Sequence, residues 1–342
     1  MTTIDVRTQS RPAPQVLAWT RSLVEPALRE AVDRLPESIR HISGYHFGWW
    51  DSSGKADRGD SGKAIRPSLV LLAAEAIGGD PATAVPMAVA VELVHNFSLL
   101  HDDVMDGDLT RRHRPTVWSV FGTGPAILAG DAMMTLAFDV IAASEHPTAT
   151  RSMRTLSTAV LHLLEGQASD VAFEDRTDVA VAECVTMAEG KTGALLGAAC
   201  ALGALVGGGS DDQVDHLGGF GRDLGLAFQH VDDLLGIWGD PAVTGKPVYS
   251  DLQNRKKSLP VVAALGASDE LGALYYREKP LTAEELERAA ELVDRAGGRA
   301  WSQSQADELL ARALSRLASA RPGARPSAEL TVLANLATRR DH

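Results

Sequence analysis

The sequence has few aromatic residues and few cysteines. Aromatic side chains make up 5% of the 342 residues while hydrophobic residues make up 45%, so the interior is built mainly from Ala, Leu and Val. This composition favours closely packed helices over a β-sandwich, and we expect an all-α protein. The two cysteines, Cys184 and Cys200, give no disulfide framework and suit a reducing cytoplasm. We therefore expect a cytoplasmic protein.

Positive charge is also scarce. The formal net charge of −12 and the pI near 5.3 argue against a general nucleic-acid surface, which needs a net basic face. The polar N-terminus lacks the apolar stretch of a secretory signal. The longest uncharged stretch, residues 193–209, is mostly Gly and Ala. It predicts a buried core helix, so we expect no stable membrane insertion.

Helical periodicity covers most of the chain. We interpret residues 1–14 as a flexible N-terminal arm and residues 15–342 as one domain, because no strand pattern, tandem repeat or linker divides the sequence. The apolar spacing predicts helical structure with interruptions over residues 16–42, and helices over residues 84–100, 125–143, 148–170, 179–188 and 211–238.

A long apolar run, residues 84–100, is followed directly by several aspartates. Glu92 and His95 are the only ionisable side chains in this run, a pattern typical of a buried helix. Asp102 and Asp106 project from one helix face about one turn apart, so their carboxylates can converge on a divalent cation. A solvated acidic helix end is the alternative, because this spacing alone is weak evidence.

Basic side chains flank this motif. Lys63 and Arg66 share one face where a helix begins and backbone N–H groups point outward, which suits an anion such as diphosphate. Arg111 and Arg112 follow the aspartates, and arginine offers a planar fork for phosphate oxygens. Surface ion pairs would explain each cluster taken separately. Further candidates along the chain are Lys191, the second acidic pair Asp232 and Asp233, and the basic loop from Lys246 to Lys256.

In this order, the motifs resemble those of the trans-isoprenyl diphosphate synthases, or polyprenyl synthetases, and most of all a bacterial short-chain geranylgeranyl diphosphate synthase. The matching positions are Gly62, Lys63, Arg66 and Pro67; Glu92, His95 and Ser98 to Asp106; Arg111, Arg112, Pro115 and Thr116; Lys191 and Thr192; Phe228, Gln229, Asp232 and Asp233; and Lys246, Asp251 and Lys256. An ordered combination of this length is specific.

The resemblance implies a fold, a reaction and a cofactor. The fold is the all-α isoprenoid synthase fold, with helices around a central cavity, usually in a homodimer. The reaction joins isopentenyl diphosphate head-to-tail in trans to an allylic diphosphate (dimethylallyl, geranyl or farnesyl) by Mg²⁺-assisted ionisation, condensation and proton elimination. Three Mg²⁺ ions are expected on Asp102, Asp106 and Asp232, with Asp103 and Asp233 in support.

The resemblance also implies how the substrates are held. Two sets of residues would bind the two diphosphates, with Arg111, Lys191, Lys246 and Lys256 on the allylic diphosphate and Lys63, Arg66, His95 and Arg112 on isopentenyl diphosphate. Thr192 and Gln229 would place oxygen dipoles near the carbocation.

The second acidic motif departs from the family pattern. Position 236 is Gly where the family has Asp, which leaves Asp232 as the inner ligand and Asp240 as a possible substitute. The spacing of these positions loosely resembles the second metal motif of class I terpene cyclases, so a cyclase is one alternative and a non-catalytic partner subunit is another. The second set of anion-binding residues favours chain elongation, because a cyclase does not need it.

Residues just before the first acidic motif set product length in this family. Phe97 and Ser98 are the fifth and fourth residues before Asp102, and the motif has no insertion. By resemblance, an aromatic residue followed by a small one implies geranylgeranyl diphosphate (C20); farnesyl diphosphate or a longer product remains an alternative. Helix geometry places Ser98 near the aspartate face and Phe97 farther round, so an ordinary core position stays open for Phe97.

Overall fold

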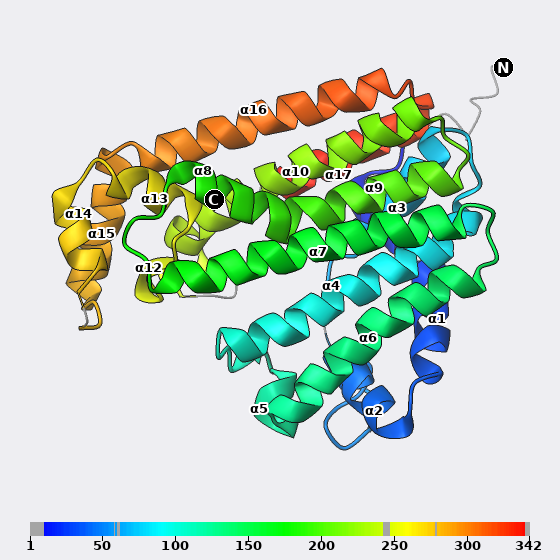
Figure 1. The fold of residues 1–342 in the computed structure, drawn as a ribbon, viewed down its shortest axis with the longest axis horizontal. Helices are drawn as coiled ribbons and strands as arrows, with labels where there is room; N and C mark the ends of the chain where they lie inside the picture. Colours follow the sequence, from blue (N-terminus) through cyan, green and yellow to red (C-terminus); the bar gives the residue numbers. More distant parts are fainter. Residues whose placement is uncertain (1–9, 58, 60–61, 242–246, 278, 339–342) are drawn as a thin grey trace. The chain divides into compact units, whose positions relative to one another are not determined.

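The structure is a computed structural model that describes residues 10–57, 59, 62–241, 247–277 and 279–338. It is 76% helical, which confirms the predicted all-α class (Figure 1). The contacts of the chain divide it into two compact units. Unit 1 consists of Met1–Thr158, Ala198–Gly218 and Leu317–Leu333, and unit 2 of Ala159–Gly197, Gly219–Arg316 and Ala334–His342. The single domain over 15–342 and the arm over 1–14 stay predictions, and α1 begins at Ala13.

Unit 1 contains the first half of the elements. They are α1 (Ala13–Asp33), α2 (Glu37–His46), α3 (Ile65–Ala76), the short 3₁₀ helix η2 (Pro81–Ala84), α4 (Val85–Met105), β1 (Thr110–Arg111), β2 (Arg114–Pro115), α5 (Val117–Phe121) and α6 (Thr123–Ala143), with parts of α7 (Ala149–Glu174), α9 (Ala194–Val206), α10 (Asp211–Trp238), α16 (Gly298–Ser319) and α17 (Ala324–Thr338).

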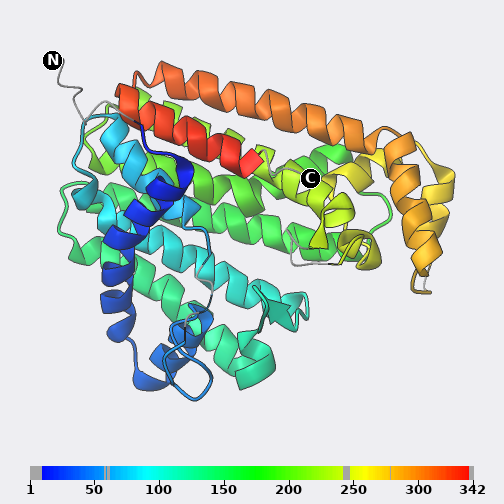
Figure 2. The same cartoon turned by 180° about the vertical axis from the view of Figure 1, so that it is seen from behind.

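Helix α4 is the central element of unit 1. It follows a turn in which the Asp80 carboxylate accepts a hydrogen bond from the Ala82 N–H at 2.9 Å, and Pro86 lies in its first turn, where a missing N–H costs nothing. Most of its side chains are buried, and it runs beside α6 (Figures 1 and 2). It ends at Met105, Asp106 is its C-cap, and the following Gly107 takes a φ of +67° that suits glycine.

Helix α9 explains the Gly- and Ala-rich stretch. A Cβ on Gly203 would lie 2.1 Å from the carbonyl oxygen of Val70, so α9 and α3 approach backbone to backbone. Ala199, Cys200 and Leu202 have no exposed surface. The prediction of a buried core helix over 193–209 is therefore confirmed for these residues.

Unit 2 contains the second half of the elements. They are α8 (Val181–Ala188), the π-helix η3 (Glu189–Gly193), α12 (Ser250–Gln253), α13 (Leu259–Leu265), α14 (Asp269–Tyr275) and α15 (Ala283–Arg295), with the remaining parts of the five helices that have residues in both units. One hydrophobic cluster joins α10, α12, α13, α14 and α15 through Ile237, Leu252, Val261, Tyr275 and Val293.

The predicted helices are present with small shifts in their bounds, but two local features were not predicted. Strands β1 and β2 have two residues each, too short to show a period-2 pattern. The π-helix η3 lies directly between α8 and α9, so the sequence pattern around it predicts only helix.

Two helical segments, Pro81–Met105 and Thr123–Ala143, are long and apolar enough to cross a membrane, with 67% and 39% of their most apolar window buried.

Candidate active site

The first acidic motif closes α4 in unit 1. Asp103 is 1% exposed, whereas Asp102 is half-buried and Asp106 is exposed. Arg111 donates from both Nε and Nη2 to one oxygen of Asp103, at 2.7 and 2.6 Å. Burial raises the pKa of Asp103 against the opposing charge of Arg111. The two carboxylates that retain solvent contact are thus the ones that the resemblance assigns to metal.

A tight hairpin brings the arginines back to this motif (Figure 2). Strands β1 and β2 pair antiparallel, with Thr110 opposite Pro115, and Arg112 and His113 form the turn with φ of 49° and 61°. Two consecutive left-handed residues are typical of a type I′ hairpin turn and cost strain in residues other than Gly and Asn. The turn therefore fixes the backbone positions of Arg111 and Arg112.

Gly62 makes room for Arg112. A Cβ at Gly62 would lie 2.6 Å from Nη2 of Arg112, and the glycine φ of +88° is itself unfavourable for other residues. Arg21 of α1 donates to the Gly62 carbonyl oxygen at 2.9 Å. The first glycine of the basic motif is needed for both reasons, and Lys63, the next residue, is exposed.

Arg66 and His95 form the centre of the second cation set. Nη1 of Arg66 lies 3.1 Å from Nε2 of His95. Because a guanidinium can only donate, Nε2 must accept, and the proton of a neutral ring then sits on Nδ1. Burial, followed by the charges of Arg66 and Arg112, holds the pKa of His95 well below its usual value. His95 is therefore a neutral hydrogen-bond donor through Nδ1.

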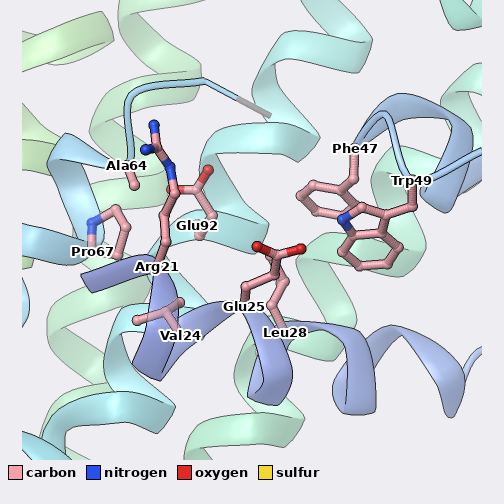
Figure 3. A pocket seen from close by; sticks show the side chains of 9 residues that line it. All are labelled: Arg21, Val24, Glu25, Leu28, Phe47, Trp49, Ala64, Pro67 and Glu92. Carbon is pink, nitrogen blue, oxygen red and sulfur yellow. The ribbon is translucent and has the colours of Figure 1, made fainter. Parts of the chain in front are cut away.

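Glu92 is the buried carboxylate behind this set. Burial raises its pKa against the opposing charge of Arg66. Asn96 donates to its carboxylate at 3.1 Å and to its backbone carbonyl at 2.8 Å. Glu92 also borders a cavity of about 40 Å³, where Figure 3 shows it near Arg21, with Phe47 and Trp49 around the same space.

The second acidic motif lies in unit 2, near the end of α10. Asp233 is 4% exposed and Asp232 is exposed. Asp233 accepts from Nε2 of Gln229 at 2.7 Å and from the backbone N–H of Leu259 at 2.8 Å. The hydroxyl of Thr192 donates to Oε1 of Gln229 at 2.6 Å. As in the first motif, the first aspartate faces solvent and the second is held inside.

Lys191 contacts a residue that the sequence reasoning missed. Its ammonium lies 2.7 Å from Oδ2 of Asp170 on α7. A Cβ on Gly166 would lie 2.4 Å from the backbone nitrogen of Lys191, so α7 and η3 meet backbone to backbone there. Gln167 beside this contact is 5% exposed, and neither polar atom of its side chain has a hydrogen-bond partner among the described residues. Polar residues three apart on an otherwise apolar face could have signalled this contact.

Lys256 is surrounded by carboxylates. Burial acts to lower the pKa of Lys256, but the charges of Asp251 and Asp233 outweigh it and raise that pKa above its usual value. Lys256 therefore stays charged. Burial in turn raises the pKa of Asp233 against the charge of Lys256. Lys246, the other predicted cation of this loop, lies outside the described residues.

Gly236 makes room for Asp251. A Cβ at position 236 would lie 2.4 Å from the carboxylate carbon of Asp251, which is 8% exposed. Ser250 donates to the Gly236 carbonyl oxygen at 3.2 Å and keeps this segment in place. Asp240 lies beyond the end of α10 and is exposed. The carboxylate next to position 236 is thus that of Asp251. The sequence spacing had suggested Asp240 as a possible substitute at this place.

The solvent-facing carboxylates of each unit are of the kind that hard divalent cations prefer. Asp102, Asp106 and Asp232 offer carboxylate oxygens with solvent contact, and Mg²⁺ prefers one or two carboxylates together with water and substrate phosphate. Within the described residues, no group of three or more His, Cys, Asp or Glu side chains could hold a metal ion.

The two predicted length-determining residues lie inside unit 1. Phe97 is 3% exposed and meets the ring of His101 edge to face at 4.8 Å. A Cβ on Gly130 would lie 2.4 Å from Nε2 of His101, so α6 has a notch for this ring. Ser98 is 9% exposed and donates to the carbonyl oxygen of His95 at 2.8 Å.

Comparison with known proteins decides the family. The polyprenyl synthetase family model matches residues 55–293. The chain belongs to the polyprenyl synthetase family. It is a trans-prenyltransferase with the all-α isoprenoid synthase fold, and enzymes of this family use Mg²⁺.

Relatives of this polyprenyl synthetase carry two product names. A (2E,6E)-farnesyl diphosphate synthase of Mycobacterium tuberculosis is 48% identical over 332 residues, 94% of this chain and 91% of the relative. A geranylgeranyl diphosphate synthase of the same organism is 49% identical over 331 residues, 95% of this chain and 93% of the relative. The crystal structure of a polyprenyl synthetase from Streptomyces coelicolor A3(2) is 47% identical, with a TM-score of 0.91, covering 95% of this chain and 99% of that one.

Proposed function

We propose that this polyprenyl synthetase condenses isopentenyl diphosphate with an allylic diphosphate and releases a C20 product. The observation that carries the reaction is that each acidic motif has an internally bonded aspartate directly after one that keeps solvent contact. The relatives named as farnesyl and geranylgeranyl diphosphate synthases support it.

Asp102, Asp106 and Asp232 would hold Mg²⁺, which when bound neutralises charge developing on the departing diphosphate. We propose three such ions. Asp103 and Asp233 cannot turn outward without losing their internal hydrogen bonds, so they support the neighbouring aspartates.

Thr192 and Gln229 are suited to face a carbocation. The Gln229 amide is oriented by donation to Asp233, and the Thr192 proton is committed to Gln229. Both oxygens therefore offer only lone pairs in fixed directions, which stabilises positive charge without reorganisation.

Product analysis tests the reaction. We expect incubation with Mg²⁺, isopentenyl diphosphate and dimethylallyl, geranyl or farnesyl diphosphate to give mainly a C20 diphosphate by mass spectrometry. A cyclic hydrocarbon formed without isopentenyl diphosphate would favour the terpene cyclase. An inert protein that restores activity to a second synthase chain would favour the partner subunit.

Ser98 is the proposed determinant of chain length, with Phe97 behind it. Ser98→Phe should shorten the product towards C15, because the added ring takes up space beside the aspartate face of α4. Ser98→Ala is the matched control, since it removes the hydroxyl without adding bulk, and it should leave the product unchanged. An unchanged product distribution in Ser98→Phe would remove Ser98 from this role.

We also propose a homodimer with α6 at its interface. Ile127 and Leu128 are 39% and 59% exposed on this apolar helix, and a second copy would cover them. Leu128→Arg should produce a monomer in analytical ultracentrifugation, whereas Ser119→Arg, a substitution outside α6, should not. A monomeric wild-type protein at micromolar concentration would contradict the proposal.

A further inference from the structure

His46 lies in a sequence segment to which the proposed reaction assigns no role. It is the last residue of α2 and is half-buried. It lines a cavity of about 30 Å³ together with Arg111, Arg112 and Arg114 of the hairpin. Asp103, the partner of Arg111, lines the same cavity, so three arginines and one carboxylate surround it. Arginines in excess of carboxylates suit the oxygens of an anion.

The protonation pattern of His46 is fixed by its neighbours on α4. Asn96 donates both to the backbone carbonyl of Glu92 and to its carboxylate. Its amide nitrogen must face Glu92, because the reversed amide would set oxygen against oxygen. The Asn96 oxygen, 3.1 Å from Nε2 of His46, is therefore an acceptor, and Nε2 carries a proton.

A neutral His46 then has only a lone pair on Nδ1. A lone pair repels an anion, whereas an added proton turns Nδ1 into a donor with full positive charge. Burial, together with Arg112 and Arg111, lowers the pKa of His46 to about 3. The negative charge of a bound diphosphate would oppose the part of this shift that the arginines cause and would favour the protonated ring.

The charged and titratable groups around His46 come from the hairpin, from α4, from α2 itself and from the loop before α3. The hairpin contributes Arg111, Arg112 and Arg114, α4 contributes Glu92, His95 and Asp103, and Tyr45 of α2 lines the same cavity. Asp103 is paired with Arg111, and Asp57 of the loop lies 3.5 Å from Arg114. All three arginines act on the His46 ring as positive charges.

We propose that His46 is a further contact residue for the diphosphate of isopentenyl diphosphate, and that its Nδ1 takes up a proton from solvent as the diphosphate binds beside Arg112. Glu92 and Asn96 are the positioning residues that hold its ring. The assignment rests on the proposed function, because Arg112 is placed on isopentenyl diphosphate there.

Two substitutions separate anion contact from a structural role. His46→Asn keeps a donor near the Nδ1 position, and His46→Gln keeps a group that can reach Asn96. If His46 contacts the diphosphate, His46→Gln should raise the KM for isopentenyl diphosphate about tenfold, the effect of one charge-assisted hydrogen bond, with kcat and the allylic KM unchanged. His46→Asn should raise that KM less. The reverse order would mean that the Asn96 bond alone matters.

Proton uptake on binding distinguishes the two roles, because a purely structural role of His46 would leave the number of protons taken up unchanged. Calorimetric titration of the full chain with isopentenyl diphosphate, near pH 7 in two buffers of different ionisation heat, should show more proton uptake by the wild type than by either His46 variant. His113→Gln, which removes an exposed histidine from the same hairpin, is the matched control and should retain the wild-type uptake.

The outcomes distinguish the two proposals. Equal proton uptake by wild type and His46→Gln, in a protein that still condenses its substrates, overturns only the inference about His46. Absence of both condensation and binding of isopentenyl diphosphate overturns the proposed function as well. A wild-type KM for isopentenyl diphosphate that rises with pH, and a flatter profile in His46→Asn, would support proton-linked binding.

Discussion

The two acidic motifs each hold one aspartate inside the protein, but they use different parts of the chain to do so. In unit 1, the internal aspartate, Asp103, is neutralised by Arg111, eight residues along the chain. In unit 2, Asp233 is held by Gln229 one turn before it and by the backbone of Leu259, 26 residues later. Its neighbouring cation, Lys256, comes from the same later segment. The first motif is thus a local structure, whereas the second depends on tertiary packing.

This difference shows where each motif tolerates change. A hairpin that follows α4 directly can neutralise Asp103 whatever happens farther along the chain. In the second motif, the carboxylate nearest to position 236 is that of Asp251, which comes from a loop farther along the chain. A change at position 236 therefore affects a contact with a distant segment.

The largest expected effect tests whether the two motifs are equivalent in the reaction. Asp102→Asn and Asp232→Asn should each lower kcat about 10³-fold, because a metal contributes several kcal/mol of charge stabilisation. Steady-state kinetics at saturating Mg²⁺ measures this.

Asp108→Asn and Asp240→Asn are the matched controls, as each removes a nearby carboxylate outside the proposed metal ligands. Both should retain activity within a few-fold. A large loss in Asp240→Asn would show that Asp240 replaces the missing aspartate after all. A mild effect of Asp232→Asn alone would show that the first motif dominates.

The next effect concerns the position at which the motifs differ. Gly236→Asp restores the sequence of the family motif. It should nevertheless lower both stability and kcat, because its carboxylate would enter the space of Asp251. Overpacking costs about 1–3 kcal/mol, and two like charges add to this. Urea unfolding and kcat measure the two effects.

The double variant Gly236→Asp/Asp251→Gly is the control for that reasoning. It moves the carboxylate from the loop to the helix and should recover part of the lost stability. In unit 1, Asp106→Gly should lower kcat without lowering stability, since Asp106 is exposed. A Gly236→Asp single variant that is more active than the wild type would contradict the predicted clash with Asp251.

The smallest effect compares buried histidines of the two units. Burial lowers the pKa of His230 in unit 2 to about 4 and that of His46 in unit 1 to about 3, from 6.5. In both, the unfolded chain binds the proton more tightly. Their contribution to stability is therefore complete above pH 6.5 and is lost as the pH falls from there towards the folded pKa.

His230→Asn keeps a polar atom near Ser302, the partner of Nδ1 at 2.8 Å, and should flatten the acid side of the stability profile. The slope should decrease by at most about 1.4 kcal/mol per pH unit. His46→Asn should act in the same direction and His113→Asn should have no effect. Urea unfolding from pH 7 to pH 4 measures the slopes, and an unchanged slope in His230→Asn would contradict a neutral buried ring.

Local patterns were sufficient to predict most helices and the residues of the first motif. An apolar run followed by aspartates and arginines is read within one stretch, and α4 with its hairpin brings them together. Three features were not predicted from the sequence: the hairpin itself, the contact of Asp170 with Lys191, and the space that Gly130 of α6 leaves for the ring of His101. Each depends on a close approach between segments that no periodicity records.

The sequence by itself determined the helical class, the order of the motifs and the residue types that bind diphosphate and metal, because apolar spacing and charge are properties of neighbouring residues. Only the tertiary structure decided which aspartate of each pair turns inward, that His95 is a neutral donor, and that Asp251 lies where position 236 has lost its side chain. Burial and hydrogen bonding settle these points, and both arise from packing between distant segments.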